Sequence, residues 1–312
     1  MRVDRARGPV VPSQLPLAGM DHDTNLNTAA EWWAEQTAVC QTTRQHWESH
    51  PIVQATMTAR RGAATSAAWL ERRLPRAPLR ALSLGAGTGL FELDLISRGA
   101  VASYDLVDIT PQLMEGAAAR AAELGFAGRI RCSTADINRI EIEPGAYDLI
   151  TFVSALHHVE RLEHVLDTCR KGLRPGGLFF ISEYVGPNRF AFPPAHADLA
   201  NEIYCSIDPR LRTQPVMPRP NPLDVAAADP TEAIRSEEIL DLVPRFFPTA
   251  ETFSADVCLT VMMWYGLNHD VVHETPEGHS FVRWLLEVDR ALVRSGRLPT
   301  YQVDTLAHMP PE

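Results

Sequence analysis

Between residues 81 and 183, short apolar runs alternate with longer stretches in which apolar positions recur at helical spacing. The apolar runs predict strands at 81–84, 104–108, 129–134, 147–153 and 178–183. The stretches between them predict helices at 90–97, 110–124 and 162–173. Two later runs, at 252–259 and 301–308, bring the predicted sheet to seven strands. Strands joined by helices of this length predict an α/β fold with a doubly wound, mostly parallel sheet.

The regions outside the alternating pattern predict a cap and a lid. Pro51 separates two helical patterns, at 29–50 and 52–73, and the first of these carries several tryptophans. The prolines of 187–230 exclude a long helix, while the aromatic residues among them favour a packed lid. The boundaries that we predict are 1–25 for a disordered N-terminus, 26–78 for a helical cap, 79–186 for the core, 187–235 for the lid, and 236–312 for the rest of the core with a helical insertion between its last two strands.

A glycine-rich loop follows the first predicted strand, in the stretch LSLGAGTG at 82–89. Glycines adopt backbone angles that other residues avoid, and they let a ligand approach the main chain at a helix N-terminus. The spacing GxGxG differs from the GxGxxG of dinucleotide folds, and no Lys-Ser/Thr pair follows to hold a triphosphate. The loop therefore predicts a ligand site, with a glycine turn that binds nothing as the alternative.

The composition and net charge indicate which classes of binding partner to expect. The chain has 312 residues, a formal net charge of -10 and no long Lys/Arg run, which disfavours a nucleic-acid partner. We expect no membrane partner, because no span of about 20 apolar residues occurs. The apolar stretch at 10–20 is broken by proline, so we expect no signal peptide. The five cysteines are widely separated and form no CxxC pair, which favours free thiols in a reducing cytoplasm and no metal site.

With these strands placed, the chain resembles a class I S-adenosylmethionine-dependent methyltransferase of the bacterial small-molecule type. The resemblance is carried by LSLGAGTG at 82–89, DLVDIT at 105–110, TADI at 134–137, YDLITFVSALHHV at 147–159 and LRPGGLFFISEYVGP at 173–187. It implies a Rossmann-like core, S-adenosylmethionine as cofactor, and in-line methyl transfer to a small organic acceptor of secondary metabolism. The protein is expected to be a monomer or homodimer. The alternatives are an enzyme that uses the cofactor without methyl transfer and a catalytically idle binding protein.

The resemblance also implies which residues contact the cofactor. The loop residues Gly85, Ala86, Gly87, Thr88 and Gly89 would pass under its methionine part. The remaining cofactor residues would be Asp108 and Ile109 at the ribose, Asp136 and Ile137 at the adenine, and Val153 and Ser154 beneath the sulfonium. Asp108 has a helix cap as its alternative role, and Asp136 a turn. Ser83 departs from the family, which often has an acidic residue there to hold the cofactor's amino group.

Several residues are candidates for the chemistry on the acceptor side. A general base is needed only if the acceptor holds a proton, and His157 or His158, after the fourth strand, can take one. Tyr184 can orient the acceptor or face the sulfonium, with packing under the lid as the alternative. The other acceptor candidates are Trp33, Asn188, Arg189 and Tyr204. We expect His269, His273 and His279 to be surface residues and not metal ligands.

Overall fold

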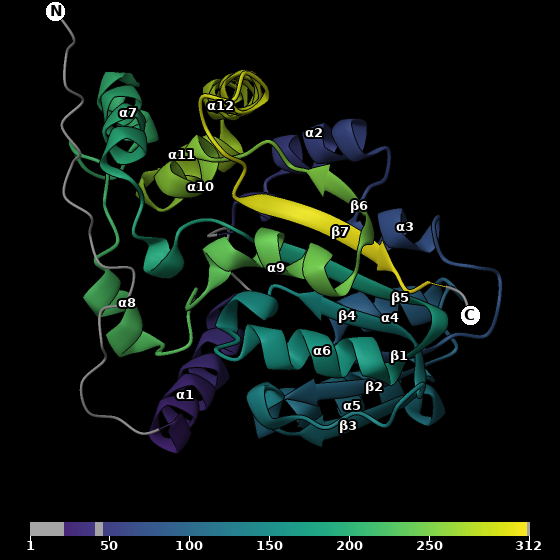
Figure 1. The fold of residues 1–312 in the computed structure, drawn as a ribbon. Helices are drawn as coiled ribbons and strands as arrows, with labels where there is room; N and C mark the ends of the chain where they lie inside the picture. Colours follow the sequence, from purple (N-terminus) through teal and green to yellow (C-terminus); the bar gives the residue numbers. More distant parts are fainter. Residues whose placement is uncertain (1–21, 41–45, 311–312) are drawn as a thin grey trace, which may run out of the picture.

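The computed structural model describes residues 22–40 and 46–310 of the chain (Figure 1). The predicted disorder of 1–25 falls mainly on residues 1–21, which lie outside the described part. The first helix, α1 (His22–Cys40), begins before the expected start at Ala29. Asp23 in its first turn suits the positive end of the helix dipole. Thr28, just before that expected start, lies inside the helix, where its hydroxyl donates to the Thr24 carbonyl.

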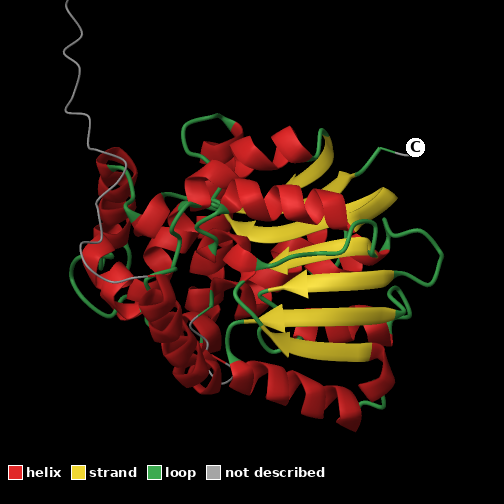
Figure 2. Ribbon diagram, turned by 60° about the horizontal axis from the view of Figure 1, so that its bottom comes forward, coloured by secondary structure: helices red, strands yellow, loops and turns green. Residues whose placement is uncertain are grey.

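Within the described residues, seven strands form one sheet, in the order β3-β2-β1-β4-β5-β7-β6 (Figure 2). Their bounds are β1 (Arg80–Leu84), β2 (Ser103–Asp108), β3 (Ile130–Thr134), β4 (Tyr147–Val153), β5 (Leu173–Tyr184), β6 (Thr249–Ser254) and β7 (Gln302–His308). The first five strands pair in parallel, and β7 is antiparallel to both of its neighbours. This confirms the predicted α/β, mostly parallel doubly wound sheet.

Helices cover both faces of the sheet (Figure 1). On one face, α3 (Ser66–Glu71), α4 (Leu90–Ser97) and α5 (Pro111–Glu123) bury Trp69, Leu95 and Met114 against the strands. On the other face, α6 (Leu162–Gly172) and α9 (Ile239–Phe246) pack on Phe152 and Phe179. With both faces covered, the ligand-accessible edge is the one at the carboxyl ends of the parallel strands.

A second core lies beyond that edge and joins the cap, the lid and the C-terminal helices. Trp264, Tyr204 and Tyr301 are buried in it. Its helices are α2 (Pro51–Arg61), α7 (Pro194–Ser206), α10 (Leu259–Met263), α11 (His269–Glu274) and α12 (Pro276–Arg294). Helix α8 (Pro222–Ala228) instead contacts α1. Short 3₁₀ helices are η1 (Trp47–Ser49), η2 (Ala127–Arg129), η3 (Ile137–Arg139), η4 (Leu156–His158), η5 (Asn188–Phe190), η6 (Pro209–Leu211), η7 (Ser236–Glu238) and η8 (Trp264–Gly266). No helix in the described part is both long and apolar enough to cross a membrane.

Three expectations about these outer elements were wrong. The single helix predicted at 52–73 is two helices, because Gly62 adopts a left-handed conformation after α2. The lid does contain a long helix, α7, since Pro194 occupies its first turn and the following residues to Ser206 are free of proline. The sixth strand ends at Ser254 rather than 259, because Asp256 has a φ of 53° and turns the chain away from the sheet.

The three histidines expected at the surface are half-buried instead. His269 and His273 pack against Trp264, and His279 lies 5.3 Å from the ring of the buried His50. His50 is fixed by a 2.8 Å hydrogen bond between its Nε2 and the Val272 carbonyl. These rings therefore contribute to the second core. Cys132, Cys169, Cys205 and Cys258 have free thiols.

Candidate functional site

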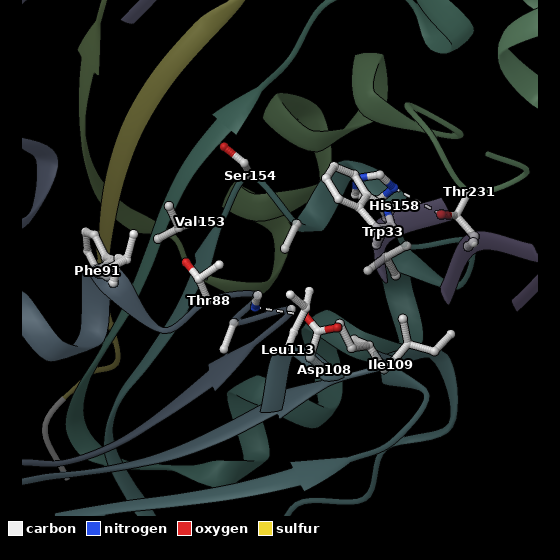
Figure 3. A pocket seen from close by; sticks show the side chains of 18 of the residues that line it. Trp33, Thr88, Phe91, Asp108, Ile109, Leu113, Val153, Ser154, His158 and Thr231 are labelled. Atoms are coloured by element: carbon white, nitrogen blue, oxygen red, sulfur yellow. Dashed lines mark hydrogen bonds between the residues drawn. The ribbon is translucent and has the colours of Figure 1, made fainter. Parts of the chain in front are cut away.

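A cavity of about 450 Å³ lies at the carboxyl ends of the first four strands, within the usual range for small-molecule pockets (Figure 3). The loops that follow β1, β2, β3 and β4 form its floor, and α1, residues 46 and 48, and Thr231 form its roof. Its lining comprises Leu26, Ala29, Trp33, His46, Glu48, Gly85, Ala86, Gly87, Thr88, Leu90, Phe91, Glu92, Asp108, Ile109, Leu113, Asp136, Ile137, Asn138, Val153, Ser154, Ala155, His158, Val159 and Thr231. All the predicted cofactor residues except Gly89 are among them.

The glycine loop needs its glycines for two different reasons. At Gly85, with φ 69°, a Cβ would lie 2.4 Å from the Ala155 Cβ, so the close packing of two loops excludes a side chain. At Gly87, with φ 53°, a Cβ would meet nothing within 4 Å, and the backbone is open to the cavity. Gly89 begins α4 with φ 68° and packs against Leu106 and Ala117 instead of lining the cavity. The loop thus leaves main chain exposed at a helix N-terminus.

Asp108 ties this loop to the end of β2. Its Oδ2 accepts a 2.8 Å hydrogen bond from the Gly87 amide, and its Oδ1 accepts one of 2.9 Å from the Thr110 amide. Thr110, the N-cap residue of α5, makes no side-chain cap, and the bond from its amide to Asp108 closes a turn just before that helix. Each carboxylate oxygen can accept a second bond, and Asp108 therefore also has capacity for a ligand hydroxyl.

Asp136 begins the 3₁₀ helix after β3 and contacts the cap. Its Oδ1 accepts from the Asn138 amide at 2.8 Å, and its Oδ2 lies 2.8 Å from His22 Nε2 of α1. Ile137 and Ile109 line the cavity beside it. Ser154, after β4, has a φ of 51°, an uncommon value for a residue with a side chain, and such strain is often found at functional turns.

Glu183, at the end of β5, organises the turn that carries the two histidines. Its Oε1 accepts from the Ala155 and Leu156 amides at 2.7 and 2.6 Å, and its Oε2 lies 2.6 Å from His157 Nδ1. Burial alone lowers the pKa of His157, but the charge and hydrogen bond of Glu183 outweigh it and raise the pKa to about 9. His157 is therefore a cation at neutral pH.

His158 lines the cavity and is held in one tautomer. Thr231 donates its only hydroxyl proton to Asp229 Oδ1 at 2.7 Å. The Thr231 oxygen must therefore accept the 3.0 Å bond that it makes with His158 Nδ1 (Figure 3). Burial and the charge of His157 lower the pKa of His158, so at neutral pH it has a proton on Nδ1 and a lone pair on Nε2. Trp33 donates to Asp229 Oδ2 at 3.0 Å and packs edge-on against the His158 ring.

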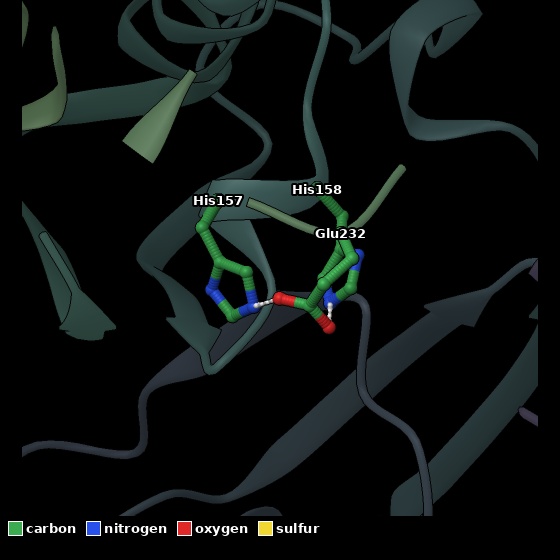
Figure 4. Close-up of side chains that lie close together, drawn as sticks. All are labelled: His157, His158 and Glu232. Atoms are coloured by element: carbon green, nitrogen blue, oxygen red, sulfur yellow. Dashed lines mark ion pairs between the residues drawn. The ribbon is translucent and has the colours of Figure 1, made fainter. Parts of the chain in front are cut away.

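Glu232 faces both imidazoles. Its two carboxylate oxygens lie 3.5 Å from His157 Nε2 and 4.0 Å from His158 Nε2 (Figure 4). These three side chains are the group in the described chain whose geometry can hold a metal ion. The same arrangement also suits an imidazolium shared between carboxylates, without a metal.

Four predicted acceptor residues lie outside the lining. Tyr184 donates to the Pro187 carbonyl, and the fully buried Tyr204 donates to the Gly266 carbonyl. Asn188 bonds to Glu237, and the Arg189 guanidinium donates to the carbonyls of the 229–232 segment. Of these four residues, Arg189 therefore supports the loop that carries Thr231 and Glu232.

Sequence reasoning missed several acids and one hydroxyl at the site. Glu92, Glu183, Asp229, Thr231 and Glu232 were not singled out, although three of them lie together in the stretch DPTEAIRS at 229–236. Their roles depend on contacts across the fold, which local patterns do not contain. The close spacing of Asp229, Thr231 and Glu232 was the signal in the sequence that could have pointed to the site.

Comparison with known proteins decides the family. Residues 81–177 match the family model of a methyltransferase domain. They form a class I S-adenosylmethionine-dependent methyltransferase domain. This confirms the predicted family, and with it the predicted cofactor, S-adenosylmethionine.

The methyltransferase domain has relatives among much longer and among similar-sized proteins. It is 35% identical over 127 residues to highly reducing polyketide synthase 2 of Gibberella zeae, a match covering 36% of this chain and 5% of the synthase. It is 28% identical over 114 residues to the ubiquinone biosynthesis O-methyltransferase of Xylella fastidiosa, covering 36% of this chain and 45% of that protein. A solved geranyl diphosphate methyltransferase in complex with SAM has a TM-score of 0.47 and 15% identity, covering 78% of this chain and 83% of that one. The chain thus matches less than half the length of either curated relative.

Proposed function

We propose that the protein transfers a methyl group from S-adenosylmethionine to a small organic acceptor that must lose a proton. The observation that carries this proposal is that a neutral, oriented His158 shares one cavity with the glycine loop. Relatives named for polyketide and ubiquinone biosynthesis support a small acceptor. Secondary metabolism is the setting that we propose.

The cavity lining fits the cofactor. Its acidic residues are Glu48, Glu92, Asp108 and Asp136, and none of the described lining residues is lysine or arginine. Such a wall suits a ligand with a cationic sulfur and hydroxyl donors, and it disfavours a phosphorylated acceptor. We assign the ribose to Asp108 and Ile109, the adenine to Asp136 and Ile137, and the sulfonium to Val153 and Ser154.

The two histidines would have different roles because their environments separate their pKa values. His158 Nε2 takes the acceptor's proton, and Glu232 and Asp229 stabilise the imidazolium that results. His157, already charged and paired with Glu183, keeps His158 neutral before the reaction. S-adenosylmethionine, when bound, supplies a methyl group on a positively charged sulfur, which the deprotonated acceptor atom takes in line. Trp33 closes the cavity above His158 and excludes water.

The metal alternative is less favoured by the charges. A charged His157 lies between Glu183 and Glu232 and neutralises part of their charge without a metal ion. Methyl transfer should therefore continue in the presence of EDTA. Loss of activity on chelation, with recovery on adding Zn²⁺ or Mn²⁺, would instead favour a metal at His157, His158 and Glu232.

The test uses methyl-deuterated S-adenosylmethionine and a panel of phenols, 1,3-dicarbonyl compounds and amines, with detection by mass spectrometry. We expect equal amounts of S-adenosylhomocysteine and a deuterated methyl product. His158→Gln should lower turnover by about 10²-fold or more, and His164→Gln, on α6 away from the cavity, should not.

Two other outcomes of this experiment would favour the alternative functions. A changed acceptor without S-adenosylhomocysteine would mean that the cofactor is used without methyl transfer. Tight cofactor binding without any product across the panel would favour an idle binding protein.

A further inference from the structure

Glu92 is a buried acid inside the cofactor cavity. It lies in the first turn of α4, directly after the glycine loop, and is only 1% exposed. Its side chain reaches back under the loop to β1, where its Oε1 accepts a 2.6 Å hydrogen bond from the hydroxyl of the equally buried Ser83. The side chain is thus fixed, with one oxygen held by the strand and the residue lining the cavity.

The other carboxylate oxygen of Glu92 lacks a partner in the part of the chain that the structure describes. Oε2 is buried and has no hydrogen-bond partner within the described residues. The described lining of the cavity includes no lysine or arginine, and the negative charge of Asp108, at the end of β2, repels the carboxylate. Burial accordingly raises the pKa of Glu92 to about 7, against the effect of the Ser83 hydrogen bond. A buried carboxylate oxygen without a donor is costly, so a cationic ligand group is the partner that this position fits.

The position of Glu92 along the cavity indicates which group of the ligand would contact its Oε2. Phe91, next to Glu92, and Ile109, next to Asp108, lie on opposite sides of the cavity (Figure 3). With the adenosine on the Asp108–Ile109 side, the amino-acid end of the cofactor would extend past Thr88 toward Phe91. That end carries an ammonium group with three N–H donors.

We propose that Glu92 accepts a hydrogen bond from the ammonium group of S-adenosylmethionine through Oε2, while Ser83 holds Oε1. Glu92 would thus supply from α4 the carboxylate that related methyltransferases often carry on β1, at the position of Ser83 in this chain. This assignment rests on the proposed use of the cavity for S-adenosylmethionine.

The test compares two ligands by titration calorimetry: S-adenosylhomocysteine and its deaminated analogue, in which hydrogen replaces the amino group. The wild-type protein should bind S-adenosylhomocysteine at least about tenfold more tightly than the analogue. Glu92→Gln, which keeps the shape of the side chain, should lose this preference by weakening S-adenosylhomocysteine alone. As a matched control, Asp108→Asn should weaken both ligands alike.

A second variant covers the case in which Glu92→Gln does not fold. The double variant Ser83→Asp/Glu92→Ser returns the carboxylate to β1 and should restore the preference for the amino group. The assignment is overturned if the wild-type protein binds both ligands equally, or if Glu92→Gln keeps the preference. If the wild-type protein binds neither ligand, the proposed function fails instead.

Discussion

At the scale of the residue, Asp108 and Glu92 show how single acids build the cavity beside the glycine loop in different ways. Asp108 accepts two backbone hydrogen bonds, so it stabilises the loop as well as facing the ligand. Glu92 accepts one hydrogen bond, from the Ser83 hydroxyl, and its other oxygen has no donor among the described residues. The first residue should therefore matter for both folding and binding, whereas the second should favour binding at the expense of stability.

The pKa of Glu92 gives a prediction about stability. Its folded-state pKa of about 7 lies above the ordinary glutamate value of 4.5, so the unfolded chain loses this proton first as the pH rises. Glu92 therefore lowers the stability of the ligand-free protein progressively between pH 4.5 and 7, by up to about 3 kcal/mol. The unfolding free energy of Glu92→Gln, measured in urea, should exceed that of the wild type above pH 7. An equal difference at pH 4.5 and pH 8 would contradict this.

A second prediction at the residue scale concerns the protonation of His157 and His158. His157 should stay charged until the pH rises to about 9, whereas His158 should be neutral at pH 7 with its proton on Nδ1. Imidazole ¹⁵N NMR reports both states. Glu183→Gln should lower the pKa of His157, because the charge that raises it is gone. Two histidines that both titrate near 6.5 in the wild type would refute the separation.

At the scale of elements, the wall of the cavity around His158 joins three segments that are distant in sequence. Trp33 on α1 and Thr231 in the lid both contact His158 at the end of β4 (Figure 3). The sequence led us to expect that the cap and the lid would close the cavity, and the structure brings residues of both to its wall. Leu26 and Ala29 of α1 also line it. A deletion of 1–50 would therefore remove part of the cavity as well as its roof.

A single substitution tests the contribution of α1 more cleanly. Trp33→Phe keeps an aromatic ring against His158 but removes the N–H that Asp229 accepts. We expect turnover to fall about tenfold, or ~1.4 kcal/mol, with S-adenosylhomocysteine affinity nearly unchanged. Trp32→Phe is the control, because Trp32 does not line the cavity. Equal turnover in the two variants would show that the indole bond has no part in positioning.

At the scale of the whole molecule, local sequence predicts what local interactions determine. The strands from Arg80 to Tyr184 and the loop at Gly85 were predictable because apolar runs and glycines encode them directly. The side-chain network was not, because Glu183, Asp229 and Glu232 meet His157 and His158 only after β5 and the lid are in place. Helix α7 was missed because proline density was averaged over a segment whose middle has none.

The most direct test of the account is a calorimetric titration of the protein with S-adenosylhomocysteine, which needs no knowledge of the acceptor. We predict saturable one-to-one binding in the wild type. Asp108→Ala should weaken it by about 2–4 kcal/mol, and Gly87→Val should abolish it by filling the open floor of the cavity, with circular dichroism confirming that both variants fold. Absence of binding by the wild type, or unchanged affinity in both folded variants, would contradict the claim that this cavity holds the cofactor.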